Sequence, residues 1–196
     1  MNDDVAAWVL AGGKSSRMGS DKAFLELDGR TLLAKVLDAV RSVTPDFHIV
    51  GPRAKFELFG PVVEDIFPDR GPLGGIHAAL SASDKDLNLV LAVDVPQVDA
   101  RFLEFLVKRA RAANAVVTVP RAAGGWQPLC AVYRRDFRDV AENALQQGRN
   151  KIDPLFQHVS LAISEESDLH KAGFTEKMFR NVNTPAEFEA VAKGTR

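Results

Sequence analysis

The residues best suited to chemistry lie in one glycine-containing loop near the start of the chain. The apolar run 5–11 leads into Gly12 and Gly13, and a polar stretch then continues to Lys22. Arg17 and Lys22 give this stretch positive charge, while glycines let backbone N–H groups approach a phosphate closely. We therefore expect the loop to bind a nucleoside triphosphate.

Two better-known phosphate loops do not fit this segment. A P-loop needs a glycine five residues before Gly13, where Trp8 stands. A dinucleotide-binding fingerprint needs its second glycine where Lys14 stands. A plain turn between a strand and a helix is the alternative reading of the glycine pair alone. The basic residues in the same loop favour phosphate binding.

Asp94 is the second candidate, because it ends 88–94, the segment that best fits a central buried strand. A carboxylate at the carboxyl end of such a strand lies at the edge where open α/β sheets bind ligands. Mg²⁺ prefers oxygen ligands and is often held by one or two carboxylates together with substrate phosphates. We expect Asp94 to hold Mg²⁺, with helix capping or loop bracing as the alternative.

A third candidate region follows the short strand 61–63. Asp65 and the glycine-rich segment 71–75 could approach a planar base or a ribose, or could form a plain loop. Asp69 is a further candidate, although beside Arg70 it could equally form a surface ion pair.

Other polar residues give weaker signals. Asn181, Asn183 and Gln127 carry amides that can read the donors and acceptors of a substrate, but such residues also form local turns. No histidine pairs with Cys130 at a metal-binding spacing, and this single cysteine excludes an internal disulfide framework. The serines of the first loop have no base nearby in the sequence, so a serine nucleophile is not expected.

Composition sets the broad class. The 196 residues are 46% hydrophobic and 26% charged, which is typical of one soluble globular domain spanning residues 1–196. A formal net charge of −1 gives no long-range attraction to nucleic acid or to an anionic membrane. No secretory leader and no membrane-spanning apolar stretch is seen, so we expect a cytoplasmic protein.

The segments that must position these residues alternate between strand and helix patterns. This alternation predicts an α/β protein with a mostly parallel sheet. Strands are expected at 5–11, 47–51, 61–63, 88–94, 115–120, 128–133 and 159–163. Helices are expected from the caps Thr31 and Asp99, at 55–60, 76–83 and 137–147, and after Thr184 at the end of the chain. Segments 64–75 and 121–126 are expected to be loops, and 164–179 to be irregular.

Together these motifs resemble the molybdenum cofactor guanylyltransferases, the MobA-like nucleotidyltransferases. The resemblance runs in family order over nearly the whole chain. The motifs that carry it are LAGGKSSRMGSDK (10–22), FLELDGRTL, VVED (62–65), GPLGGI (71–76), VDVP (93–96), QPLCAVY (127–133) and NVNTPAEF (181–188). The first loop is shared with other nucleotidyltransferases, and the closing NVNTP narrows the choice.

The resemblance implies a Rossmann-like three-layer sandwich and transfer of GMP from Mg-GTP to molybdopterin. The nucleotide-binding residues it implies are Leu10, Ala11, Gly12, Gly13, Lys22, Asp65 and Asp94. Lys22 would bind the phosphates, Asp94 would hold Mg²⁺, and Arg17, Asn181 and Asn183 would face the pterin substrate. Lys22, Arg17 and Asp94 would be the catalytic groups. A monomer with transient contacts to molybdoenzymes or to other proteins of cofactor biosynthesis is expected.

Two positions bear on the choice of nucleotide. Cytidylyltransferase relatives usually carry alanine where Gly12 stands, so Gly12 favours guanine. Gly51 stands where the family often has an asparagine that touches the nucleotide. The alternatives are therefore transfer from CTP to molybdopterin, an NTP with a sugar phosphate, and a GTP-binding module without catalysis.

Overall fold

The computed structural model describes residues 3–12 and 21–180. The strands are β1 (Val5–Leu10), β2 (Glu26–Leu27), β3 (Arg30–Thr31), β4 (Phe47–Val50), β5 (Val62–Val63), β6 (Leu87–Ala92), β7 (Val117–Ala122), β8 (Gly125–Trp126), β9 (Cys130–Arg134) and β10 (Leu161–Glu165). The α-helices are α1 (Leu32–Val43), α2 (Arg53–Phe56), α3 (Pro72–Ala82), α4 (Ala100–Ala112), α5 (Phe137–Gln146) and α6 (Glu166–Lys171). Short 3-10 helices are η1 (Lys22–Phe24), η2 (Asp153–His158) and η3 (Glu176–Phe179).

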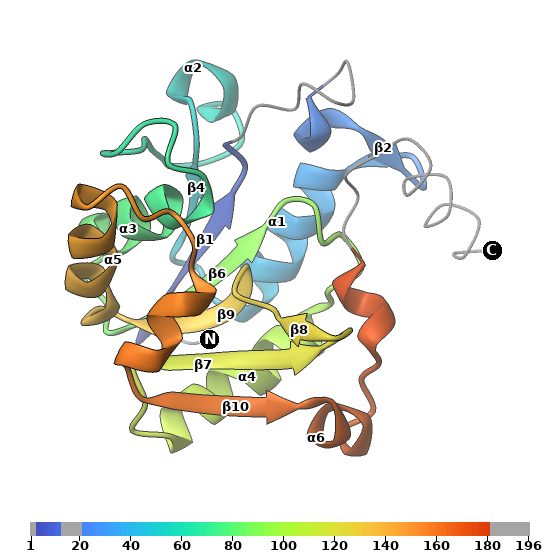
Figure 1. The fold of residues 1–196 in the computed structure, drawn as a ribbon. Coiled ribbons are helices and arrows are strands. Elements are labelled where there is room, and N and C mark those ends of the chain that lie inside the picture. Colours follow the sequence, from blue (N-terminus) through green and yellow to red (C-terminus); the bar gives the residue numbers. More distant parts are fainter. Residues whose placement is uncertain (1–2, 13–20, 181–196) are drawn as a thin grey trace.

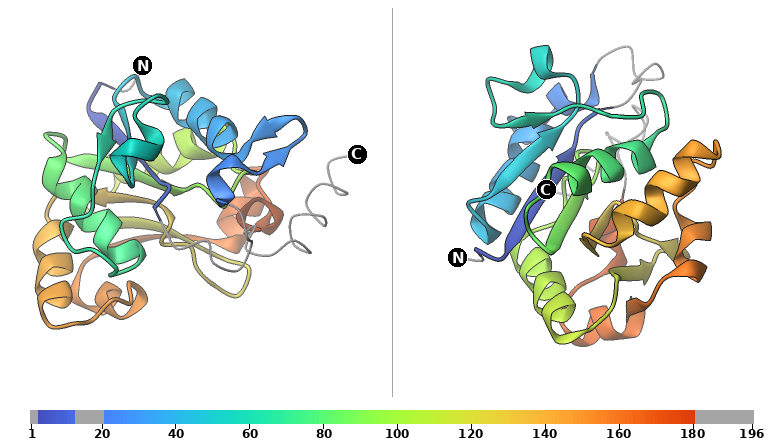
Figure 2. Two further views of the ribbon diagram at one scale, coloured as in Figure 1. Left: turned by 90° about the horizontal axis from the view of Figure 1, so that it is seen from above. Right: turned by 90° about the vertical axis from the view of Figure 1, so that its left-hand side faces the viewer.

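In the described part of the chain, eight strands form one mixed sheet (Figure 1). Its order is β10-β7-β9-β6-β1-β4-β5, with β8 paired to β7, and β9 is antiparallel to both of its neighbours. Helices cover both faces, which gives three layers (Figure 2). The expected α/β Rossmann-like sandwich with a mostly parallel sheet is confirmed.

The two central strands, β1 and β6, are buried along their whole length. A strand covered by helices on both faces is apolar throughout, but β6 carries the fully buried Asn88. Its side-chain oxygen accepts a hydrogen bond of 3.0 Å from the Trp8 indole N–H. Its amide donates to the carbonyls of Lys85 and Asp86, so this polar side chain joins the two strands without an unsatisfied group.

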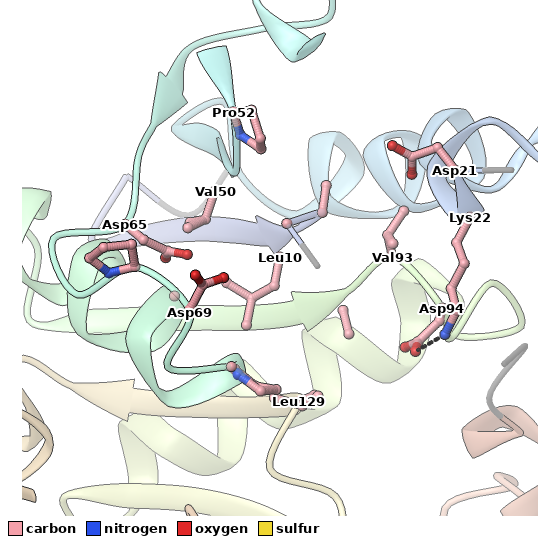
Figure 3. Close-up of a pocket in the computed structure, with 17 residues that line it drawn as sticks. Leu10, Asp21, Lys22, Val50, Pro52, Asp65, Asp69, Val93, Asp94 and Leu129 are labelled. Carbon is pink, nitrogen blue, oxygen red and sulfur yellow. Dashed lines mark ion pairs between the residues drawn. The ribbon is translucent and has the colours of Figure 1, made fainter. Parts of the chain in front are cut away.

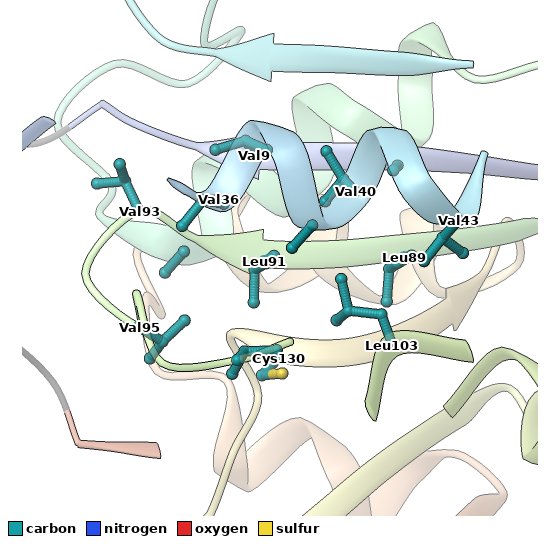
Figure 4. Packing of buried hydrophobic residues seen from close by; sticks show 14 of the residues in the cluster. Val9, Val36, Val40, Val43, Leu89, Leu91, Val93, Val95, Leu103 and Cys130 are labelled. Carbon is teal, nitrogen blue, oxygen red and sulfur yellow. The ribbon is translucent and has the colours of Figure 1, made fainter. Parts of the chain in front are cut away.

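Two apolar clusters hold the layers together. Helices α1 and α4 pack on one face, where Val36, Val40 and Leu103 meet the strand residues Val9 and Leu91 (Figure 4). Helices α3 and α5 cover the other face. The apolar spacing of α1 places its buried residues on one side, as the sequence predicts.

Both predicted helix caps in the described residues are confirmed. The Thr31 hydroxyl accepts from the N–H of Ala34, and the Asp99 carboxylate accepts from the N–H of Phe102. The helix predicted after Thr184 lies outside the described residues.

Helix α3 corrects the expectation of a loop through residue 75. It starts at Pro72, since Gly71 precedes it with φ = 65° and proline is favoured at the first helical position. Gly74 and Gly75 therefore lie inside the helix, although glycine is a poor helix former. A Cβ on Gly74 would lie 3.0 Å from the Phe67 carbonyl oxygen, so close packing requires glycine there.

Other boundaries also differ from the prediction. Helix α2 starts at residue 53 instead of 55, because the Glu64 carboxylate accepts from the N–H of Arg53. Strands β7 and β10 pair with each other and start two residues later than predicted. The expected loop 121–126 contains β8, which forms a hairpin with β7. The segment 164–179, which was expected to be irregular, contains α6 and η3.

Among the described residues, no helix has the length and apolar character needed to cross a membrane.

Asn88→Ala should destabilise the protein by about 1–3 kcal/mol, because it leaves the buried indole N–H of Trp8 without its acceptor. Urea unfolding followed by far-UV circular dichroism measures this free energy. Asn143→Ala, at an exposed position of α5, is the matched control and should stay within about 0.5 kcal/mol of the unmodified protein. Equal stability of the two variants would contradict the role of Asn88.

Candidate functional site

A pocket of about 650 Å³ opens at the carboxyl ends of β1, β4 and β6 (Figure 3). One set of lining residues is apolar and comprises Leu10, Ala11, Val50, Pro52, Pro68, Pro72, Ala92, Val93 and Leu129. A second set is charged and comprises Asp21, Lys22, Asp65, Asp69 and Asp94. Apolar walls with a few placed polar groups are typical of a small-molecule site, and the strand edge is where such folds bind ligands.

Lys22 and Asp94 meet at one side of this pocket. The Lys22 Nζ lies 3.5 Å from the Asp94 Oδ2, and each side chain is 20% exposed. Lys22 begins η1. The sequence predicted Asp94 at the end of a strand, but β6 ends at Ala92 and Asp94 lies in the turn that follows. The Val93 N–H donates to the Leu10 carbonyl at 3.1 Å, which ties this turn to the end of β1.

Asp65 and Asp69 supply two carboxylates at the opposite side of the pocket, after β5 (Figure 3). Asp65 is exposed as a residue, but its carboxylate turns into the pocket (Figure 3), and partial removal from water there raises its pKa above the ordinary value of 3.8. Gly75 allows this arrangement, because a Cβ there would lie 3.7 Å from the Asp65 Oδ1 and 3.3 Å from the Leu10 side chain.

Gly12 and Gly51 lie against each other where β1 and β4 end. A Cβ on Gly12 would be 3.4 Å from the Gly51 Cα, and a Cβ on Gly51 would be 2.9 Å from the Phe56 ring. The Phe56 ring thus accounts for glycine at position 51. The N–H groups of Ala11 and Gly12 both donate to the Val50 carbonyl at 3.0 Å. These two N–H groups therefore hold the start of the loop against the end of β4.

Most of the residues singled out from the sequence come together here. Leu10, Ala11, Gly12, Lys22, Asp65 and Asp94 all line the pocket. Gly13, Arg17, Asn181 and Asn183 lie outside the described residues. The roles assigned to all of these residues stay predictions.

The pocket also contains residues that the sequence analysis did not select. Asp21 directly precedes Lys22, and its carboxylate accepts from the Ala23 N–H at 3.1 Å, which caps η1. An aspartate just before a short helix is a recognisable cap, so this signal was available. Leu129 carries no such signal, because an apolar residue beside a strand is ordinarily part of the core.

Several other polar candidates have structural partners. The Gln127 amide donates to the Ala122 carbonyl at 2.9 Å and so closes the β7–β8 hairpin. Cys130 is buried, and burial raises the pKa of its thiol far above the ordinary value. His48 stacks on Trp8 with ring centroids 4.4 Å apart, which confirms a structural role for this histidine.

One further group of possible metal ligands lies outside the pocket. Glu166 and His170 on α6 and Glu176 on η3 place their ligand atoms within 4.8 Å of one another. His170 Nε2 lies 3.3 Å from the Glu176 carboxylate, and both side chains are exposed. This geometry is that of a surface ion pair.

Comparison with known families shows which family the chain belongs to. Residues 7–160 match the family described as "MobA-like NTP transferase domain". The chain belongs to this family. It is 35% identical to the molybdenum cofactor guanylyltransferase of Desulfosudis oleivorans, over 95% of this chain and 94% of the relative. It is 32% identical to a probable molybdenum cofactor guanylyltransferase of Clostridium perfringens, over 96% of each chain.

A solved structure supports the same assignment. The molybdopterin-guanine dinucleotide biosynthesis protein A of Archaeoglobus fulgidus superposes with a TM-score of 0.85 at 26% identity. The match covers 97% of this chain and 98% of that one. The MobA-like chain is therefore a nucleotidyltransferase, and its pocket lies where α/β proteins of this topology bind their ligands.

Asp65→Asn should increase the free energy of unfolding at neutral pH. The pKa of Asp65 is higher in the folded protein than in the unfolded chain. Once the pH rises above the ordinary pKa of this carboxyl, its ionisation therefore opposes folding. The stability advantage of Asp65→Asn should therefore be absent in acid, grow with pH, and become constant above the folded-state pKa.

Urea unfolding at a series of pH values measures this difference. Asp84→Asn, in which an exposed carboxylate is removed, is the control for a change in surface charge. An advantage of Asp65→Asn that shrinks as pH rises would show that the folded protein favours the charged form.

Proposed function

We propose that this MobA-like protein transfers GMP from Mg-GTP to molybdopterin, forming the guanine dinucleotide form of the cofactor and releasing pyrophosphate. We infer that it does so in the cytoplasm and as a monomer. The observation that carries the proposal is the Lys22–Asp94 pair, 3.5 Å apart, at the edge of a pocket large enough for a nucleotide. The names of the relatives at 32–35% identity supply the pair of substrates.

The far side of the pocket supports guanine as the base. Its apolar walls, Leu10 and Val50 among them, suit the faces of a planar ring. Guanine presents a ring N–H and an amino group side by side, and a carboxylate accepts both together. Asp65 and Asp69 both line the pocket, and we assign this contact to one of their carboxylates. Cytosine presents an amino group beside a ring acceptor, which a charged carboxylate would repel.

The residues present fit Mg²⁺. Asp94 offers hard carboxylate oxygens at the sheet edge, and a magnesium ion is commonly held by one or two carboxylates together with substrate phosphates. When bound, the ion would neutralise part of the phosphate charge.

The reaction needs no nucleophile from the protein. The terminal phosphate of molybdopterin attacks the α-phosphorus of GTP. The new bond joins an oxygen of the molybdopterin phosphate to the α-phosphorus. The bond from the α-phosphorus to the oxygen that bridges it to the β-phosphate breaks, which releases pyrophosphate. Two anions must meet, and each pair of unit charges about 4 Å apart costs about 4 kcal/mol at an effective dielectric constant near 20. Lys22 offsets part of this repulsion and stabilises the charge that develops on the departing pyrophosphate.

Residues outside the described part of the chain complete the proposal. The N–H groups from Gly13 onward are assigned to the phosphates, because those of Ala11 and Gly12 already donate to β4. Arg17, Asn181 and Asn183 are assigned to molybdopterin on the basis of the family resemblance.

The proposed function is tested by incubating the protein and Mg²⁺ with molybdopterin and each of the four NTPs in turn. We expect pyrophosphate release and a dinucleotide product with GTP, detected by chromatography and mass spectrometry. Turnover with CTP alone would overturn the choice of guanine. GTP binding without product would show a binding module instead of an enzyme. A parallel incubation replaces molybdopterin with sugar phosphates, and turnover only in that incubation would show that a sugar phosphate is the acceptor.

Asp94→Asn should lower kcat by about 10²–10³-fold or more, because the amide keeps the shape of the side chain but lacks the charge that holds the metal. Steady-state kinetics across a range of Mg²⁺ concentrations measures the loss. Thermal unfolding should confirm that the variant is folded. Activity near that of the unmodified protein would contradict the role of Asp94 as metal ligand.

A further inference from the structure

Two short helices that are distant in the sequence meet at the mouth of the pocket. Helix η1 carries Lys22, and α2 follows the end of β4. Lys55 of α2 forms an ion pair with Asp21, the residue that caps η1. Beside this pair, the Phe24 ring lies 5.9 Å from the Phe56 ring, so a charged contact and an aromatic contact join the two helices.

The Asp21 carboxylate has two functions at once. One oxygen accepts the N–H of Ala23 at 3.1 Å and so fixes the start of η1, and the other pairs with Lys55. Lys22 is the next residue, and its Nζ lies 3.5 Å from Asp94. Any rotation of the Asp21 side chain would therefore change the first turn of η1 and the direction of Lys22.

Helix α2 is itself fastened to the edge of the sheet. The Arg53 N–H donates to the Glu64 carboxylate at 3.0 Å, and its guanidinium donates to the Val62 carbonyl at 2.9 Å. Phe56 is fully buried and packs against Gly51, where a Cβ would lie 2.9 Å from the ring. A side chain at position 51 would push α2 outward, so this glycine lets Lys55 reach Asp21.

We propose that Lys55 is a positioning residue, which holds η1 through Asp21 so that Lys22 stays directed at the phosphates and Asp94. This inference rests on the proposed function for the reaction in which Lys22 acts. Lys55 does not line the pocket, whereas Asp21 and Lys22 do, so its effect passes through them. An ion pair with an exposed lysine contributes little to the stability of the fold. We therefore assign this pair the role of holding the Asp21 side chain in place.

The test compares Lys55→Met with Lys35→Met. Lys35 forms an ion pair of 2.7 Å with Asp28 and lies outside the pocket, so it is a matched control for the loss of one lysine ion pair. Lys55→Met should lower kcat by about 10–100-fold, because small misplacements of a catalytic group cost that much. The Kd for Mg-GTP should stay within about twofold, and Tm should fall by less than about 4 °C.

Two further measurements separate positioning from other roles. Lys55→Arg should restore most of kcat, because it keeps the charge and the reach of the side chain. Amide hydrogen exchange of Ala23 and Leu25 should be faster in Lys55→Met but unchanged in Lys35→Met, because both N–H groups donate within η1.

Several results would overturn the inference. One is a kcat equal to that of Lys35→Met. Another is a raised Kd with unchanged kcat, which would make Lys55 a direct ligand of the nucleotide. A lower kcat without faster exchange in η1 would also contradict positioning. Absence of transfer by the unmodified protein would refute the proposed function alone, and the exchange measurement would still decide whether Lys55 holds η1.

Discussion

The site depends on the parallel alignment of β1 and β6. Leu10 pairs with Ala92 at the ends of these strands, so the loop that leads to Lys22 and the turn that carries Asp94 leave the sheet side by side. The Val93 N–H and the Leu10 carbonyl continue the pairing one step beyond the strands. A shift of either strand by one residue would turn all of its buried side chains to the other face of the sheet. The core thus brings the end of β1 and the turn that carries Asp94 to the same edge of the sheet.

Close packing on the nucleotide side of the sheet is the second constraint. Gly12, Gly51 and Gly75 each lie where a Cβ would meet backbone, a ring or a side chain. Gly75 lies within α3, and a glycine in a helix costs about 1 kcal/mol relative to alanine. Burial of Leu73 and Ile76 against the sheet offsets this cost. Gly12 and Gly75 line the pocket, so close packing and the shape of the pocket depend on the same two residues.

The sequence predicts those parts of the structure that depend on local pattern. The apolar spacing of α1, the caps Thr31 and Asp99 and the position of Asp94 after an apolar strand can all be deduced from residue types. Long-range packing cannot. The contact between Gly74 and Phe67, the contact between Gly51 and Phe56 and the link from Lys55 to Asp21 join segments whose proximity only the folded chain creates.

The pairing of Lys22 with Asp94 explains how two charges can remain in a partly buried site before substrate binds. Each side chain is only 20% exposed, and a charge removed from water needs a counter-charge. The pair provides this counter-charge and also keeps both groups in place. In the proposed reaction Lys22 would bind phosphate oxygens and Asp94 would hold the metal ion, so each charge would exchange one partner for another. Within the described residues, this pair is therefore formed before substrate binds, and the free energy of binding is not needed to bring these two side chains together.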